Sequence, residues 1–130
     1  MSDERYRRGL ATIEQVMGEG GSEGLVSLAE DAPELARYAI EAFGELYADQ
    51  ALDVRTRELL TVAALTAMGN APSQLKTHVG GALNAGCTEA EVVAAITQMY
   101  AYAGFPAALN GLKVALETFR ERKERSQETG

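Results

Sequence analysis

The chain has 130 residues and a net charge of -7, with 46% hydrophobic and 24% charged residues. This length predicts a single domain over residues 1–130, so a functional site must lie within that domain or between copies of it. The acidic excess argues against nucleic acid and against anionic membrane surfaces as partners, because both require Lys and Arg to neutralise phosphate. No stretch approaches the roughly 18 consecutive apolar residues that a membrane-spanning helix needs.

Helical signals dominate the first half of the chain, and no alternation of apolar and polar residues predicts a strand. We expect a first helix over residues 4–17 and a glycine-rich loop over residues 18–24. The segment Asp31–Glu34 has the Asp-x-x-Glu spacing of a capping box and predicts a helix over residues 32–49. Asp53 is expected to cap the next helix, whose apolar residues on almost every side predict that it is buried nearly all round.

The second half of the chain contains equally clear helix boundaries. Gly69–Pro72 breaks the chain, and a helix over residues 72–85 is expected to follow it. Thr88–Glu91 is a second capping box, and Gly104–Pro106 separates the helix that it opens from the last one. The sequence therefore predicts an all-α fold of about six helices. The short break predicts that the helices on either side of it form a central antiparallel hairpin.

His78 is the only histidine in the sequence, and Glu58 precedes it by twenty residues. Histidine both gives and takes a proton near neutral pH. At about 1.5 Å of rise per residue, Glu58 and His78 lie within about one turn of the same height on the two helices of the hairpin. We therefore predict that they form a catalytic acid–base pair. The alternatives are a structural histidine and a glutamate that only faces the positive end of its helix dipole.

Three cations lie near this pair in the sequence: Arg55, Arg57 and Lys76. The arginines fall in the first turn of a helix, where cations are mildly unfavourable against the dipole. Together with Lys76 they are predicted to bind a small anionic organic substrate through charge-assisted hydrogen bonds. The alternative is that each forms a surface ion pair, with Asp53, with Glu58 or with a neighbouring subunit.

Cys87 is the only cysteine. A single cysteine excludes an intramolecular disulfide and any Cys-x-x-Cys redox or zinc site, so we expect no bound metal. It also fits a reducing, cytoplasmic location. We expect Cys87 to act as an inert, small apolar side chain.

Several segments, taken in their order and spacing, resemble the carboxymuconolactone decarboxylase family: Glu4–Gly9, Leu52–Leu65, Gln74–Gly86, Thr88–Val92 and Tyr102–Ala108. The resemblance implies an alkylhydroperoxidase D-like all-α fold, no cofactor, and assembly as a homotrimer or homohexamer. The family's peroxidase branch carries Cys-x-x-Cys-x-x-x-His, and the two cysteine positions of that frame are Ala71 and Gln74 here. Without a thiolate at these positions, peroxidase activity is not expected.

The resemblance therefore points to the decarboxylase branch, which converts γ-carboxymuconolactone to β-ketoadipate enol-lactone in aromatic catabolism. Under this hypothesis His78 is the general acid, Glu58 orients or recharges it, and the three cations hold the substrate. The chain departs from the family's usual pattern at Phe43 and Tyr47, where tryptophans are typical, and at Glu58, where a small residue is common. It also has one more residue between the hairpin helices. Two alternatives stay open: an enzyme acting on another lactone or keto acid, and a non-catalytic oligomeric binding protein.

Overall fold

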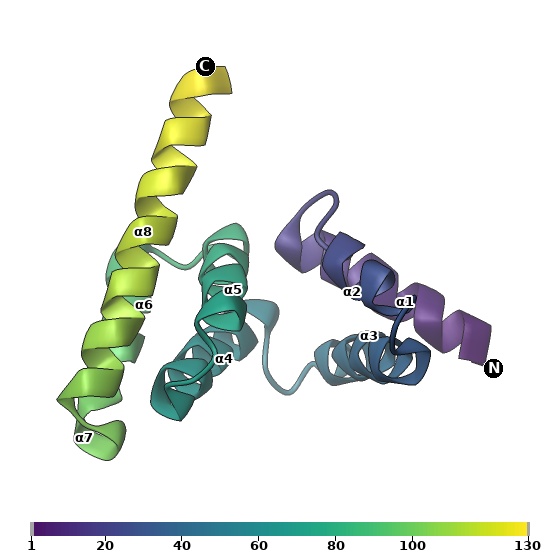
Figure 1. Cartoon of the computed structure of the whole chain (residues 1–130), viewed down its shortest axis with the longest axis horizontal. Coiled ribbons are helices and arrows are strands. Elements are labelled where there is room, and N and C mark those ends of the chain that lie inside the picture. Colours follow the sequence, from purple (N-terminus) through teal and green to yellow (C-terminus); the bar gives the residue numbers. More distant parts are fainter. Residues whose placement is uncertain (1, 130) are drawn as a thin grey trace. The chain divides into compact units, whose positions relative to one another are not determined.

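The computed structural model describes residues 2–129, and over this range every regular element is a helix (Figure 1). The all-α prediction is confirmed, with eight helices between residues 2 and 129 in place of about six. Their bounds are α1 Ser2–Met17, α2 Glu23–Leu28, α3 Pro33–Ala48, α4 Val54–Met68, α5 Pro72–Asn84, α6 Glu89–Gln98, α7 Tyr100–Ala103 and α8 Phe105–Thr129. None of these helices has both the length and the apolar character needed to cross a membrane.

The chain divides into two compact units, Met1–Val54 and Arg55–Gly130. In the first, α1 packs on α3 at very short range because glycines meet where the helices cross. A Cβ placed on Gly44 would lie 2.8 Å from the Cα of Gly9, and a Cβ on Gly9 would collide with the backbone of Ile40. The buried apolar residues of this unit are Ile13, Val16, Ala36 and Ile40. The expectation that residues 1–130 form a single domain stays a prediction.

The start of α3 differs from its prediction. The N-cap is Ala32, with no side-chain cap hydrogen bond, so the capping box predicted at Asp31 is wrong. The short helix α2, which we did not predict, continues into a turn in which the backbone N–H of Asp31 donates to the carbonyl of Leu28 at 3.1 Å. Asp31 therefore belongs to the end of this turn, and Pro33 begins the helix with its pre-set backbone angle.

The second unit has one apolar core to which α4, α5, α6 and α8 all contribute. Its buried members are Val62, Leu75, Val79, Ala82, Cys87, Val92, Ile96, Ala115 and Phe119. Helix α8 packs against both α5 and α6, and Arg122 near its end donates a hydrogen bond to the Asn84 side chain at 2.9 Å. The long last helix thereby links α5 and α6.

The break between α4 and α5 forms as the sequence predicts. Gly69 follows α4 with φ +75, a left-handed conformation that glycine adopts without strain, and Pro72 begins α5. Near the break Thr66 and Leu75 line the same hollow, whereas farther from it Glu58 reaches His78. Residues nearer the start of α4 therefore lie near residues nearer the end of α5. This order of contacts is that of a helical hairpin.

The turn from α5 into α6 is also specified locally. Gly86 has φ +102, its N–H donates to Leu83 O at 3.1 Å, and the N–H of Cys87 donates to Ala82 O at 3.0 Å. These two bonds form a Schellman motif, which turns Cys87 toward the core. The predicted capping box at Thr88 and Glu91 is confirmed, since each side chain accepts the backbone N–H of the other at 3.0 and 2.8 Å.

Helix α4 is not buried nearly all round, so that prediction is wrong for the single chain. Its buried residues are Glu58, Val62 and Thr66, which recur at every fourth position and form one stripe. Leu60 and Met68, on other faces, are 55% and 60% exposed. The chain covers one side of this apolar helix and leaves another uncovered.

Candidate active site around Glu58 and His78

Glu58 and His78 meet inside the second unit. The Nδ1 atom of His78 lies 3.1 Å from Oε1 and 3.2 Å from Oε2 of Glu58. The glutamate side chain is fully buried, whereas the imidazole is 19% exposed. An ionised carboxylate only accepts hydrogen bonds, so opposite an ionised Glu58 the Nδ1 atom of histidine is the donor. The pair combines a buried carboxylate with a ring that reaches the surface.

Backbone geometry sets this meeting. Glu58 begins the buried stripe of α4, one turn before Val62. On α5, His78 lies one turn after Leu75 and next to Val79, both of which are in the core. Val62 on α4 and Leu75 and Val79 on α5 belong to the same apolar core. This core therefore fixes the positions of the two helices that carry Glu58 and His78. A hydrogen-bonded pair held by a packed core keeps its geometry without relying on flexible loops.

The first turn of α4 is tied to the turn between α5 and α6. The Cys87 thiol donates to the backbone carbonyl of Arg55 at 3.7 Å. The Arg55 guanidinium forms an ion pair with Glu91, the capping-box residue of α6. These contacts anchor α4 one turn before Glu58.

The predicted substrate-binding cations, Arg55, Arg57 and Lys76, lie in different surroundings. Lys76 lies 3.0 Å from one carboxylate oxygen of Glu121 and 3.8 Å from Glu117, both on α8. The hydrogen bond to Glu121 raises the pKa of Lys76 above its ordinary value. The structure thus gives Arg55 and Lys76 carboxylate partners on α6 and α8 and does not join either of them to the Glu58–His78 pair. Arg57 is half-buried and directly precedes Glu58.

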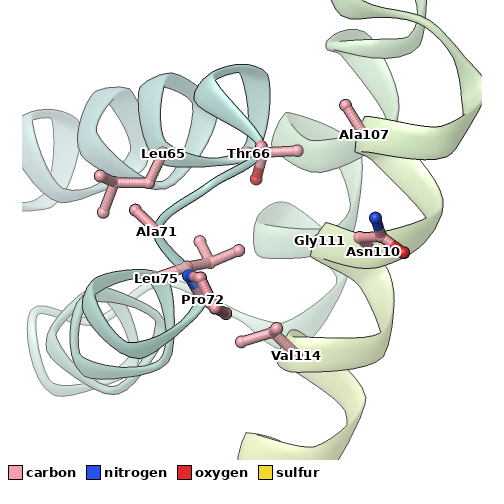
Figure 2. A pocket seen from close by; sticks show the side chains of 10 residues that line it. Leu65, Thr66, Ala71, Pro72, Leu75, Ala107, Asn110, Gly111 and Val114 are labelled. Carbon is pink, nitrogen blue, oxygen red and sulfur yellow. The ribbon is translucent and has the colours of Figure 1, made fainter.

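The second unit also contains hollows that we did not predict. One of about 200 Å³ lies between α4, α5 and α8 (Figure 2), one of about 360 Å³ between α4 and α6, and one of about 220 Å³ beside α7. Neither Glu58 nor His78 lines any of these three. No group of three or more metal-ligating side chains occurs between residues 2 and 129.

Comparison with known proteins gives a family match over most of the chain. Residues 33–117 match the model of the carboxymuconolactone decarboxylase family. The chain belongs to this family. It is 32% identical over 127 residues to a 4-carboxymuconolactone decarboxylase from Acinetobacter baylyi, an alignment that covers 93% of this chain and 92% of that protein. The predicted family is therefore confirmed.

A second member of the comparison is a Paracoccus denitrificans protein described as an uncharacterized 15.0 kDa protein in the nqo9-nqo10 intergenic region. It is 39% identical over 83 residues, which are 63% of this chain and 62% of that protein. The chain thus spans less than two thirds of the length of this relative.

The two positions that correspond to the cysteines of the family's peroxidase branch hold residues without sulfur in this chain. Ala71 lies in the break between α4 and α5, and Gln74 is exposed on the first turn of α5. Cys87 is only 5% exposed and lies in the core. The residues around His78 can therefore move a proton but offer no thiolate nucleophile.

Proposed function

We propose that this protein is a cofactor-independent decarboxylase of γ-carboxymuconolactone or a closely related anionic lactone. The observation that carries the proposal is the hydrogen bond between His78 Nδ1 and the fully buried carboxylate of Glu58, with the ring itself partly exposed. Family membership and the name of the Acinetobacter relative support the reaction class. The absence of cysteine from positions 71 and 74 supports the decarboxylase branch over the peroxidase branch.

The reaction needs one proton and a place for negative charge. When the bond to the leaving carboxylate breaks, its electron pair passes into the conjugated lactone and carbon dioxide departs. We propose that protonated His78 then delivers a proton from Nε2 to carbon, while Nδ1–H remains bonded to Glu58. The buried carboxylate holds the ring orientation and stabilises the imidazolium before transfer. Atoms and charge balance without an added oxidant or reductant.

Arg57 is the cation that we place at the substrate carboxylate. It adjoins Glu58 in the sequence and is half-buried, so a salt bridge to the substrate would be partly shielded from water. Arg55 stays a predicted substrate binder beside Arg57, and Lys76 stays a predicted auxiliary cation. An arginine suits this role because its fork of N–H donors matches a carboxylate.

The experiment is an ultraviolet assay of carbon dioxide loss from enzymatically generated γ-carboxymuconolactone. His78→Gln should lower turnover by at least about a hundredfold, because a general acid contributes about 10²- to 10⁴-fold. Gln74→Ala, an exposed change one turn away on the same helix, is the matched control. Turnover near wild type in His78→Gln would remove histidine from the mechanism. No turnover in the wild type would remove this substrate and turn attention to other lactones or keto acids.

We also propose that the protein assembles as a homotrimer or homohexamer through the uncovered side of α4. This side carries Leu60 and Met68 and borders the hollow between α4 and α6. Glu91, the only charged residue of that hollow, is paired with Arg55. For a chain of net charge -7, such a surface lets like-charged copies approach without strong repulsion.

Sedimentation equilibrium tests the assembly. Leu60→Glu should dissociate the oligomer, because each copy would bury an unpaired charge. Leu116→Glu, which changes a similarly exposed leucine on α8, is the control and should leave the mass unchanged. A wild-type protein that sediments as a monomer would contradict the proposal.

A further inference from the structure

The hollow between α4, α5 and α8, here called the α8 hollow, is lined by the side chains drawn in Figure 2. It has a floor of buried residues and a rim of exposed ones. Thr66, Leu75 and Gly111 are buried at its floor, whereas Gly69 and Asn110 are exposed at its rim. Its other lining residues are Leu65, Ala71, Pro72, Ala107 and Val114. A molecule from solution could enter past the rim and reach apolar side chains.

Small residues create this space where helices come close. At Gly111, helix α8 approaches α4 so tightly that an added Cβ would lie 2.7 Å from Cγ2 of Thr66. Beside this contact the chain places Gly69, Ala71 and Ala107, which have little or no side chain to fill the gap. Helices α4 and α8 therefore meet closely at Gly111, and a hollow of about 200 Å³ lies next to this contact.

The lining carries no charge, and this restricts what can bind. All ten lining residues are uncharged. Lys76 follows Leu75 in the sequence, but its ammonium group is bonded to Glu121 on α8. A charged ligand would give up hydration in this hollow without gaining an ion partner, so binding of an ion there is disfavoured.

Two lining side chains can hydrogen-bond to a ligand. The Thr66 hydroxyl donates its proton to Val62 O at 2.8 Å, so it can only accept one from a ligand. The Asn110 amide at the rim both donates and accepts. The volume is below the roughly 300 Å³ at which pockets for drug-sized molecules begin. A ring of five or six atoms with one polar group matches this combination of size and chemistry.

We propose that the α8 hollow binds a small, uncharged organic molecule, with its apolar body on Leu75 and Val114 and its polar group at Asn110. This site goes beyond the proposed function, because that substrate is an anion and the hollow includes neither Glu58 nor His78. A ligand here would contact α4, α5 and α8 at once. It would therefore bind the folded second unit and not the unfolded chain.

Two probes of similar size test the charge selectivity: cyclopentanone and cyclopentanecarboxylate. Methyl ¹H–¹³C NMR spectra of the full chain should show cyclopentanone shifting the resonances of Leu65, Leu75 and Val114, with a dissociation constant on the order of millimolar. The carboxylate should bind at least about tenfold more weakly, since its charge has no partner in the hollow. Equal binding of both probes would overturn the proposal, as would shifts centred on Leu60 in the hollow between α4 and α6.

Variants locate the site. Ala107→Leu should fill the α8 hollow and abolish the shifts, whereas Ala95→Leu adds the same atoms to the hollow between α4 and α6 and should leave them intact. Asn110→Leu should weaken cyclopentanone binding, and circular dichroism establishes that each variant is folded. His78→Gln should bind cyclopentanone as the wild type does. Loss of binding in that variant, or unchanged binding in Ala107→Leu, would place the ligand elsewhere and refute the proposal.

Discussion

Each unit of the chain buries one glutamate beside a cationic or protonatable partner, and the two partners differ in kind. In the first unit, Glu41 has a 7% exposed side chain, and one of its oxygens lies 3.5 Å from the Arg5 guanidinium. In the second, Glu58 is fully buried and lies 3.1 Å from His78 Nδ1. Arginine keeps its proton under all conditions in a protein, whereas histidine exchanges it near neutral pH. Similar burial therefore gives the glutamate a permanently charged partner in one unit and an ionisable partner in the other.

The hydrogen bonding of the two carboxylates shows the same contrast. Both oxygens of Glu58 lie within hydrogen-bond distance of His78. The Oε1 atom of Glu41 is buried and has no hydrogen-bond partner among the described residues, and Arg5 is shared with Glu45. An unpartnered buried acceptor costs about 1–3 kcal/mol. Glu58 thus occupies a geometry that satisfies it, while Glu41 is tolerated at some cost to stability.

The largest expected difference between the two sites is in turnover. Glu58→Gln removes the charge that stabilises protonated His78 and should lower turnover by about a hundredfold. Glu41→Gln makes the same chemical change in the first unit and should leave turnover near the wild-type value. The ultraviolet assay of carbon dioxide loss measures both. Equal losses in the two variants would mean that both carboxylates act only through stability, and the contrast drawn above would fail.

Packing gives the next largest effect, in the unfolding free energy of the first unit. Gly9→Ala places a methyl group against the Ile40 backbone, which cannot rotate away as a side chain could. It should lower the unfolding free energy by about 1–3 kcal/mol, the usual range for overpacking. Gly24→Ala is the matched control, because a Cβ there has nothing within 4 Å. Urea denaturation measures both, and a Gly9→Ala protein as stable as Gly24→Ala would show that α1 and α3 can separate without cost.

A smaller effect is expected from the arginines. Arg57 is the arginine that we assign to the substrate, because it is half-buried and adjoins Glu58. Arg57→Ala should raise KM by about tenfold with less change in kcat, as expected when binding shared by ground state and transition state is lost. Arg55→Ala should change KM less. A larger rise in KM for Arg55→Ala would transfer the binding role to that residue.

The smallest expected effect is a pH dependence of the first unit. Hydrogen bonds from Ser22 Oγ at 2.8 Å and from the Gly21 N–H at 3.1 Å reach Glu14, and they lower the pKa of this carboxyl below its ordinary value of 4.5, although burial opposes them. Because the folded pKa is the lower one, the stabilisation is present above pH 4.5 and is lost as the pH falls through the folded value.

Glu14→Gln tests this dependence. The variant should lose less stability than the wild type when urea midpoints are compared at pH 6 and at pH values below about 4.5. Identical pH slopes for the two proteins would show that the Ser22 and Gly21 hydrogen bonds do not contribute. The second unit has its own acid-sensitive contact, since the hydrogen bond from Lys76 lowers the pKa of Glu121.

Local patterns in the sequence were enough to predict the helical hairpin and the meeting of Glu58 with His78. Gly69 and Pro72 mark the break, and helical rise brings the two side chains to similar heights. The capping box at Thr88 depends on residues three apart, and it also forms as predicted. At Asp31 the same kind of pattern failed, because the preceding turn of α2 uses that residue first.

Contacts between distant segments could not be predicted in this way. Lys76 meets Glu121 only because α8 packs along α5, and Arg55 meets Glu91 only because the Schellman motif at Gly86 brings α6 back to the start of α4. The α8 hollow is made by missing side chains at glycine and alanine positions. Small residues leave no periodic signal that distinguishes a hollow from close packing.

Cys87 is a site at which local opening of the second unit can be measured by chemical labelling. The first unit has no cysteine, and Cys87 as a residue is 5% exposed. A thiol-reactive reagent can therefore modify the chain only when the helices around Cys87 separate. The labelling rate at increasing urea concentration reports the free energy of that local opening. Opening of the helices that carry Glu58 and His78 can thus be followed separately from α1 and α3, without introducing a cysteine by mutation.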